Sequence, residues 1–166
     1  MPDKITPIDL MTGYAQRIQD WLRQKNVEAE LLNFEESVHS VEDTVAVTGY
    51  SAERITKSIV MLTLAGNLVI AMVPAKNRVS TERVRKFLGL DERPRMATAE
   101  EIEMHTGQKP GGNSPFNAQN AKILIDPKLL ENDWIITGGG DDKHLVKIST
   151  DELKRVIDFT ETRIRK

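Results

Sequence analysis

The chain has 166 residues, of which 39% are hydrophobic and 29% are charged, and its net charge is −2. This composition is typical of one folded domain rather than a disordered segment, and the small negative charge argues against a strongly basic nucleic-acid-binding protein. The chain has no cysteine, which excludes disulfides and thiolate chemistry, and it has neither a signal pattern nor an apolar run of the ~18 residues that a membrane span needs; we therefore expect a cytoplasmic location and no membrane partner.

The first third of the chain predicts two helices and a strand. Apolar residues at helical spacing run from about residue 6 to residue 26, with Thr6 as the expected cap and Pro7 in the first turn. Residues 28–34 are compatible with a strand. Ser40 precedes two acidic residues and predicts a short helix that ends at Gly49, and Ser51 is placed to cap one further turn.

The middle of the chain predicts a β-hairpin. Two apolar runs, 55–64 and 68–75, flank the short turn Ala65-Gly66-Asn67. Residues 59–62 are apolar at consecutive positions, so we expect both faces of the first strand to be covered.

The second half alternates capped helices with short strands. Ser80 is expected to cap a helix that stops at Gly89. Thr98 and Glu101 are expected to form a capping box at the start of a helix that stops at Gly107. The remaining predictions are strands at 122–125, 134–137 and 144–148, a turn at 138–140, and a last helix from Ser149 to about Arg165. This interleaving predicts an α/β fold with a mixed sheet and packed helices in a single domain.

Residues 107–115 combine three glycines with two prolines. Glycine allows a close approach of the backbone and proline fixes φ, so the pattern predicts a stiff loop whose exposed N–H groups suit an oxyanion, a carbonyl or a hydroxyl group. The alternative is an ordinary surface turn, which is rich in the same residues.

Few side chains in the sequence are candidates for chemistry. Lys57 shares a strand face with Ile59 and Met61, so it either reaches solvent at the strand end or points into a site. The three histidines lack metal-ligand spacing, and we expect no metal site. His144 is expected to be exposed at the start of a strand, and Asp126 to cap a helix.

Positive side chains gather in two segments, residues 76–78 and 83–86. Such a patch either contacts a phosphate backbone or forms a solvated helix face, and the charge pattern alone favours the solvated face.

Several segments form a recognisable pattern when they are taken in order. They are His39-Ser40-Val41-Glu42, Ile55-Thr56-Lys57-Ser58-Ile59-Val60, Val73-Pro74-Ala75 with Asn77-Arg78-Val79, Gly111-Gly112-Asn113-Ser114-Pro115-Phe116, Ile123-Leu124-Ile125-Asp126 and Gly139-Gly140. Together they resemble the YbaK family, the editing domain associated with prolyl-tRNA synthetase, and the resemblance covers roughly residues 28–160.

The resemblance implies a compact domain with a barrel-like mixed sheet at residues 28–166, preceded by an N-terminal helix at residues 1–27. It implies an enzyme that hydrolyses a wrong amino acid from tRNA, here as a free-standing protein acting in trans on tRNA-Pro or a similar tRNA. The implied partners are the acceptor end of mischarged tRNA and, as a further candidate, an aminoacyl-tRNA synthetase. No cofactor is implied, since the aminoacyl ester is already activated.

The resemblance also implies roles for particular residues. Lys57 would anchor the phosphate or ribose of the terminal adenosine, and the Gly-x-x-x-Pro loop would hold the aminoacyl end. The residues implied as catalytic are Lys57, Gly111, Gly112 and Ser114, and those implied as substrate-binding are His39, Ser58, Asn113, Pro115, Phe116, Gly139 and Gly140.

This chain departs from the family pattern at three places. Ser58 stands where members specialised for alanine carry asparagine, so a preference for alanine is not implied. Leu145 stands where some members carry an acidic residue, with Asp142 and His144 nearby, and Asn113 stands where a small apolar residue is more usual. These departures leave open an alternative, a non-catalytic module of the same fold that binds tRNA or a synthetase.

Overall fold

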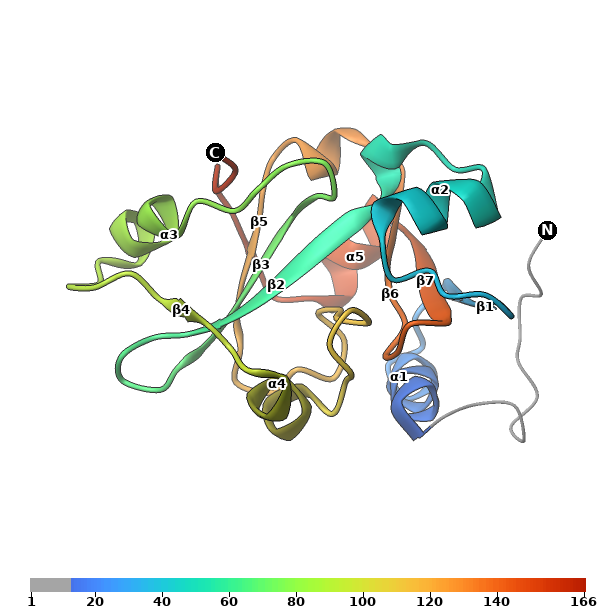
Figure 1. Ribbon diagram of the computed structural model, residues 1–166, viewed down its shortest axis with the longest axis horizontal. Helices are drawn as coiled ribbons and strands as arrows, with labels where there is room; N and C mark the ends of the chain where they lie inside the picture. The colour runs from blue at the N-terminus through green and yellow to red at the C-terminus, as the bar shows by residue number, and fades with distance from the viewer. Residues whose placement is uncertain (1–12) are drawn as a thin grey trace.

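The strands form two sheets in the computed structural model, which describes residues 13–166 (Figure 1). The smaller sheet is antiparallel throughout, and the larger one is mixed, with parallel pairing at β3–β5 and β5–β8. In spatial order the smaller sheet contains β1 (Ala29–Asn33), β7 (His144–Ser149) and β6 (Trp134–Gly138). The larger contains β4 (Arg95–Met96), β2 (Thr56–Leu62), β3 (Leu68–Pro74), β5 (Lys122–Ile125) and β8 (Thr160–Glu161).

The predicted hairpin is confirmed as β2 and β3, which pair from Thr56↔Pro74 to Leu62↔Leu68. Every residue of β3 is buried, because one face packs in the main core with Ile70 and Met72 and the other packs in a second cluster with Val69 and Ala71. This two-sided burial explains why the hairpin sequence is apolar at consecutive positions.

Within residues 13–166 one isolated bridge joins the two sheets, and beyond it β2 and β6 separate. Ile55, just before β2, forms an isolated parallel bridge with Ile136 of β6. Further along β2, β4 pairs only with Met61 and Leu62. Between these two contacts, no strand of the described chain pairs with the outer edge of β2 over residues 56–59. This open edge gives the molecule a crevice between its two sheets.

Short polar residues set the helix boundaries as the sequence predicts. Ser40, Ser80, Thr98 and Ser149 each accept a hydrogen bond from the backbone amide three residues later, and Thr98 forms a reciprocal capping box with Glu101. Figure 1 shows α3 next to the C-terminus and α2 beside the β6–β7 sheet. The helices are α1 (Gly13–Gln24), α2 (Val41–Thr48), α3 (Thr81–Leu88), α4 (Ala99–Thr106), α5 (Thr150–Val156) and the 3₁₀ turns η2 (Ala52–Arg54) and η3 (Leu129–Glu131).

The first helix packs into the same core as the sheets. Its residues Ile18 and Leu22 belong to the main cluster, and the ring of Trp21 lies 5.5 Å from that of Phe116. The predicted cap at Thr6 and Pro7 lies outside the described residues. The division of the chain at residue 27 stays a prediction.

The predicted final helix is wrong beyond Val156. The chain leaves α5 at Ile157 in an extended conformation, and β8 then pairs in parallel with β5. Farther on, the carboxylate of Asp126 accepts hydrogen bonds from the backbone amides of Ile164 and Arg165. The predicted role of Asp126 as a helix cap is wrong, because Lys128 is the N-cap residue of η3 and no side chain caps that turn. Oδ1 of Asp126 instead accepts a hydrogen bond from the backbone amide of Lys128. The contacts of β8 and of the Ile164 and Arg165 amides connect segments that are far apart in sequence. The conformation of the last ten residues therefore depends on distant partners and not on local helix propensity.

The mixed α/β fold in a single domain is confirmed, although the strands form two sheets that share an isolated bridge and do not close into a barrel in residues 13–166. In the same residues, every helix is too short or too polar to cross a bilayer.

Candidate functional site

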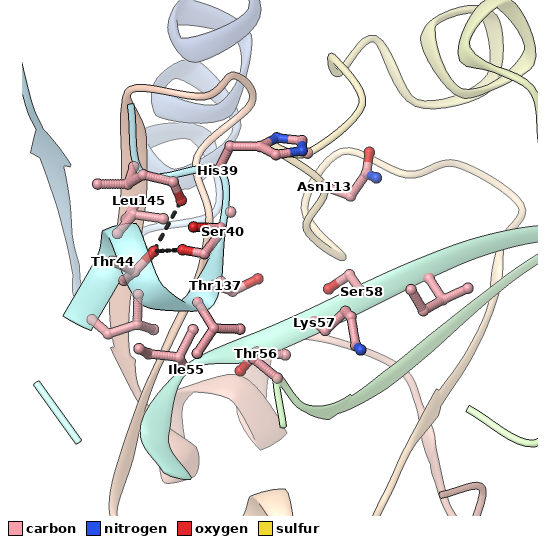
Figure 2. Close-up of a pocket in the computed structure, with 17 residues that line it drawn as sticks. His39, Ser40, Thr44, Ile55, Thr56, Lys57, Ser58, Asn113, Thr137 and Leu145 are labelled. Carbon is pink, nitrogen blue, oxygen red and sulfur yellow. Dashed lines mark hydrogen bonds between the residues drawn. The ribbon is translucent and has the colours of Figure 1, made fainter. Parts of the chain in front are cut away.

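A cleft of about 260 Å³ opens where β2 separates from β6. Its walls are the open edge of β2, the end of β6, the start of α2 and the loop that contains Gly111 (Figure 2). Figure 2 shows Ile55 and Leu145 toward one side of the cleft, its apolar end, and Lys57, Ser58 and Asn113 toward the other, its polar end. The lining also includes the apolar residues Val38, Val41 and Ile136 and the polar residues Thr56 and Thr137.

Lys57 supplies the positive charge of the cleft. The residue is half-buried on β2, and its ammonium has no hydrogen-bond or ion-pair partner among residues 13–166. Burial lowers the pKa of Lys57 below its usual value, and repulsion from the Arg78 guanidinium lowers it further. A partly buried cation without a counter-ion is costly, so Lys57 is poised to bind an anionic group.

Four side chains that line the cleft carry buried oxygens without a hydrogen-bond partner among residues 13–166, namely Thr56, Ser58, Asn113 and Thr137. Native proteins pair the great majority of such atoms. Thr44, at the apolar end, follows that rule because its hydroxyl lies 2.9 Å from the carbonyl oxygens of both Val38 and Ser40 (Figure 2). Unpartnered oxygens gathered in one cleft indicate a place where a polar ligand binds.

The glycine-rich loop is held in place by a residue that the sequence analysis missed. Gln108 is fully buried, and its amide nitrogen donates to the carbonyls of Ser114 and Phe116. Its amide oxygen accepts from the Ser114 backbone at 2.7 Å and from the Ser114 hydroxyl at 3.0 Å. The only sequence signal for this role is that a glutamine lies within the predicted loop, which is too weak to identify it.

The loop is also fixed to the turn that follows β6. The Lys109 amide donates to the carbonyl of Gly140, and the Gly140 amide donates to the carbonyl of Gly112. A Cβ at Gly112 would overlap the backbone of Asp141, so only glycine allows this approach. Gly111, with φ of +88°, lies at the mouth of the cleft against the exposed ring of His39.

The structure brings some of the predicted site residues together and places others elsewhere. His39, Lys57, Ser58, Gly111 and Asn113 line the cleft. Ser114 is buried against Gln108, and Phe116 lies in the main core. The predicted residues that do not line the cleft are Gly112, Ser114, Pro115, Phe116, Gly139 and Gly140.

Thr56 and Thr137 are among the cleft residues that were not predicted from the sequence. Thr56 lies next to Lys57 and Thr137 lies next to the Gly138–Gly140 run, but a threonine in a predicted strand is normally read as a strand former. Their positions at the split between the sheets become visible only in three dimensions.

His144 differs from its prediction. It is 4% exposed rather than solvent-facing, and its Nδ1 lies 2.7 Å from Oδ1 of buried Asp141. The pair connects the turn after β6, which contains Asp141, to the first residue of β7, which is His144. The next residue of β7, Leu145, lines the cleft. No group of three or more His, Asp or Glu side chains within residues 13–166 is arranged to hold a metal ion.

Comparison with solved structures defines the class of fold. The chain superposes on a candidate trans-editing enzyme for prolyl-tRNA synthetase with a TM-score of 0.84 and 21% identity, over 94% of this chain and 99% of the other. A protein designated APE2540 gives a TM-score of 0.82 with 23% identity, over 90% of this chain and 99% of the other. At these identities the likeness establishes a shared fold.

Sequence comparison identifies the family. Residues 35–156, well over half of the chain, match the aminoacyl-tRNA editing domain. The chain therefore belongs to the aminoacyl-tRNA editing domain family, which confirms the resemblance drawn from the sequence, and this membership supports an editing function.

Individual relatives occur in two settings. The proline–tRNA ligase of Nitratidesulfovibrio vulgaris (strain DP4) is 28% identical over 113 residues, which are 67% of this chain and 19% of the ligase. The uncharacterized protein YwhH of Bacillus subtilis (strain 168) is 24% identical over 131 residues, which are 78% of this chain and 82% of YwhH. The chain thus spans about a fifth of the ligase that it matches.

Proposed function

We propose that this chain is a hydrolase that removes a wrongly attached amino acid from tRNA, acting in trans on tRNA-Pro or a similar tRNA. The observation that carries the proposal is the ammonium of Lys57 beside a cluster of buried oxygens, all without a partner in the part of the chain that the structure describes, at an open strand edge in an editing-domain fold.

In this proposal the terminal adenosine lies across the open edge of β2. Lys57 binds its phosphate or ribose, since a charge-assisted hydrogen bond to an anionic oxygen offsets the cost of burying the ammonium. The side chain of the amino acid enters the apolar end, between Ile55, Ile136 and Leu145. The ester bond then lies at the polar end of the cleft.

The chemistry requires no protein nucleophile. Water attacks the ester carbonyl carbon, the bond to the ribose oxygen breaks, and the proton lost by water goes to that oxygen. The products are the free amino acid and uncharged tRNA. Because the ester is activated, placement of substrate and water supplies most of the acceleration. The engagement of the Ser114 hydroxyl with Gln108 agrees with a mechanism in which Ser114 is not the attacking group.

The first test is deacylation of a panel of mischarged tRNAs by the wild type and Lys57→Ala. The panel contains alanyl-, cysteinyl- and seryl-tRNA with the proline anticodon, together with the same amino acids on tRNAs of other identity. We expect rapid release of at least one amino acid, and a loss of about 100-fold in Lys57→Ala, equivalent to ~2.7 kcal/mol. Lys154→Ala, which changes an exposed lysine of α5, is the matched control and should be unaffected.

Two results would contradict the proposal. Equal deacylation by Lys57→Ala and the wild type would remove Lys57 from the site. Tight tRNA binding without hydrolysis of any panel member would favour the alternative, a non-catalytic module that binds tRNA or a synthetase.

A further inference from the structure

Two of the unpartnered hydroxyls face one another across the cleft. Ser58 extends from β2 and Thr137 from β6, and Figure 2 shows their oxygens pointing toward each other. Ser58 is 7% exposed and Thr137 is 1% exposed. Neither hydroxyl has a hydrogen-bond partner in the described chain, and they do not bond each other.

The position of this pair follows from the split between the sheets. The parallel bridge between Ile55 and Ile136 brings β2 and β6 together. Thr137 is the next residue along β6, and Ser58 lies three residues along β2, where the strands have separated. Side chains alternate along a strand, so Ser58 and Lys57 point to opposite faces of β2, as Figure 2 shows. The hydroxyl pair and the ammonium can therefore contact different parts of one substrate.

The charges around the cleft indicate what the pair binds. A hydroxyl can donate or accept a hydrogen bond, so geometry alone leaves the sign of the bound group open. The described residues that line the cleft include no Asp or Glu, while Lys57 is a cation and Arg78 adds to the positive potential. In this field a group that gains negative charge is favoured over an ammonium group, so the hydroxyls act as donors.

We infer that Thr137 and Ser58 form the oxyanion hole of the proposed deacylation, with both hydroxyls donating to the ester carbonyl oxygen as it becomes negatively charged. Water adds to the carbonyl carbon and the carbonyl π-electrons move to that oxygen. When the tetrahedral intermediate collapses, the electrons return, the bond to the ribose oxygen breaks, and that oxygen takes the proton from the attacking water. Thr137 is thus a catalytic residue beyond those implied by the family resemblance, and the inference rests on the proposed function.

The test separates transition-state stabilisation from substrate binding. The variants are Thr137→Val, which keeps the shape and removes the hydroxyl, Thr137→Ser, which restores the hydroxyl, and Ser58→Ala. The substrate is the panel member that the wild type deacylates fastest. We expect Thr137→Val to lower kcat about 100-fold, as loss of one oxyanion donor does, while KM changes by less than about twofold because the ground-state carbonyl gains little from the donor.

Two comparisons show whether the hydroxyl itself is responsible. Thr137→Ser should recover most of the lost kcat, and Thr81→Val, which makes the same change in α3 away from the cleft, should leave kcat and KM unaltered. If Thr137→Val does not fold, as judged by its thermal melt, Ser58→Ala carries the same test with the same expected fall in kcat.

A second substrate distinguishes a role at the carbonyl from a role at the amino group. The loss caused by Thr137→Val should be the same for the aminoacyl-tRNA and for its N-acetylated form, since acetylation leaves the ester carbonyl unchanged. A loss that disappears on acetylation would assign the pair to the ammonium group and overturn the inference. An unchanged kcat in Thr137→Val, an effect on KM alone, or no recovery in Thr137→Ser would also overturn it.

The outcome for the wild type keeps this inference distinct from the proposed function. If the wild type deacylates a panel member in a Lys57-dependent manner and kcat does not depend on Thr137, the proposed function is supported and the proposed oxyanion hole is contradicted. If the wild type deacylates no panel member, both the proposed function and the oxyanion hole are contradicted.

Discussion

Two buried polar clusters, one around Asp126 and one in the cleft, differ in whether their oxygens are hydrogen-bonded. Asp126 is fully buried at the end of β5, and its two carboxylate oxygens together accept from three backbone amides and from the Arg165 guanidinium. In the cleft, the oxygens of Ser58, Thr137 and two neighbouring residues have no partner in residues 13–166.

This difference separates polar groups that stabilise the fold from polar groups kept for a ligand. A hydrogen bond to a charged group contributes about 1.5–3 kcal/mol, whereas a buried polar group left unpaired costs about 1–3 kcal/mol. The Asp126 cluster thus stabilises the C-terminal segment, and the cleft is maintained at the expense of stability. Substitutions in the two clusters should therefore have opposite signatures.

The largest effect on stability is expected from Asp126→Ala. Removing the carboxylate leaves Arg165 and two backbone amides of the tail without their acceptor, and the loss of one partner from a buried ionic cluster costs about 3–5 kcal/mol. Urea denaturation should show this fall in the free energy of unfolding. The control is Asp158→Ala, an exposed aspartate just after the end of α5, which should change the free energy of unfolding little. A change below about 1 kcal/mol in Asp126→Ala would show that the tail is not held by this carboxylate.

The pH dependence of stability should follow the same cluster. Burial by itself raises the pKa of Asp126, but hydrogen bonds from the amides of Lys128, Arg165 and Ile164 and from the Arg165 side chain outweigh it and hold the pKa below its usual value. A lowered pKa contributes stability above the unfolded-state value of about 3.9, and this contribution is lost as the pH falls through the folded-state value. Wild type and Asp126→Ala should therefore converge in stability under strongly acidic conditions.

A smaller loss, about 2 kcal/mol, is expected from Gln108→Ala. The substitution leaves the Ser114 amide and the carbonyls of Ser114 and Phe116 without their partner in a buried loop. Deacylation should fall as well, because the loop presents Gly111 and Asn113 to the cleft. Gln119→Ala alters an exposed glutamine of the same segment and is the control for urea denaturation and for activity. Unaltered stability in Gln108→Ala would mean that the loop holds its shape without this side chain.

The parts of the fold that were predicted correctly depend on contacts close in sequence. Ser40, Ser80 and Thr98 cap helices through amides three residues away, and the β2–β3 hairpin closes over a short turn. The parts that were missed depend on distant partners. Asp126 binds amides 38 and 39 residues later, and this long-range contact accompanies a chain end that is extended rather than helical.

The candidate site shows the same division between local and distant contacts. The sequence pattern found Lys57, Ser58, Gly111 and Asn113, which the structure brings into one cleft. It could not distinguish Gly111, at the cleft mouth, from Gly112, which packs on the backbone of Asp141, because both are glycines in the same motif. Thr137 was missed because its significance comes from lying opposite Ser58 on another sheet.

The smallest effect expected concerns the pH dependence of deacylation through Lys57. Because burial and Arg78 lower its pKa below the usual 10.5, Lys57 loses its proton at a lower pH than an exposed lysine, and activity that requires the ammonium falls as the pH rises through this lowered value. Above it, kcat/KM should fall about tenfold, or ~1.4 kcal/mol, per pH unit once spontaneous ester hydrolysis is subtracted. In the complex with substrate, the negative phosphate favours the charged form of Lys57 and raises its pKa again. Because kcat reports the complex and kcat/KM the free enzyme, kcat should persist to higher pH than kcat/KM.

Lys57→Arg sharpens this test, because a guanidinium keeps its charge throughout the accessible range. The variant should be less active, since its planar group does not match the position of the ammonium, but its kcat/KM should stay flat where the wild type declines. A decline of the same form in Lys57→Arg would assign the titration to another group. In that case the ammonium would be a feature of the fold rather than of the reaction, and the contrast between the cleft and the Asp126 cluster would rest on the side-chain oxygens of the cleft alone.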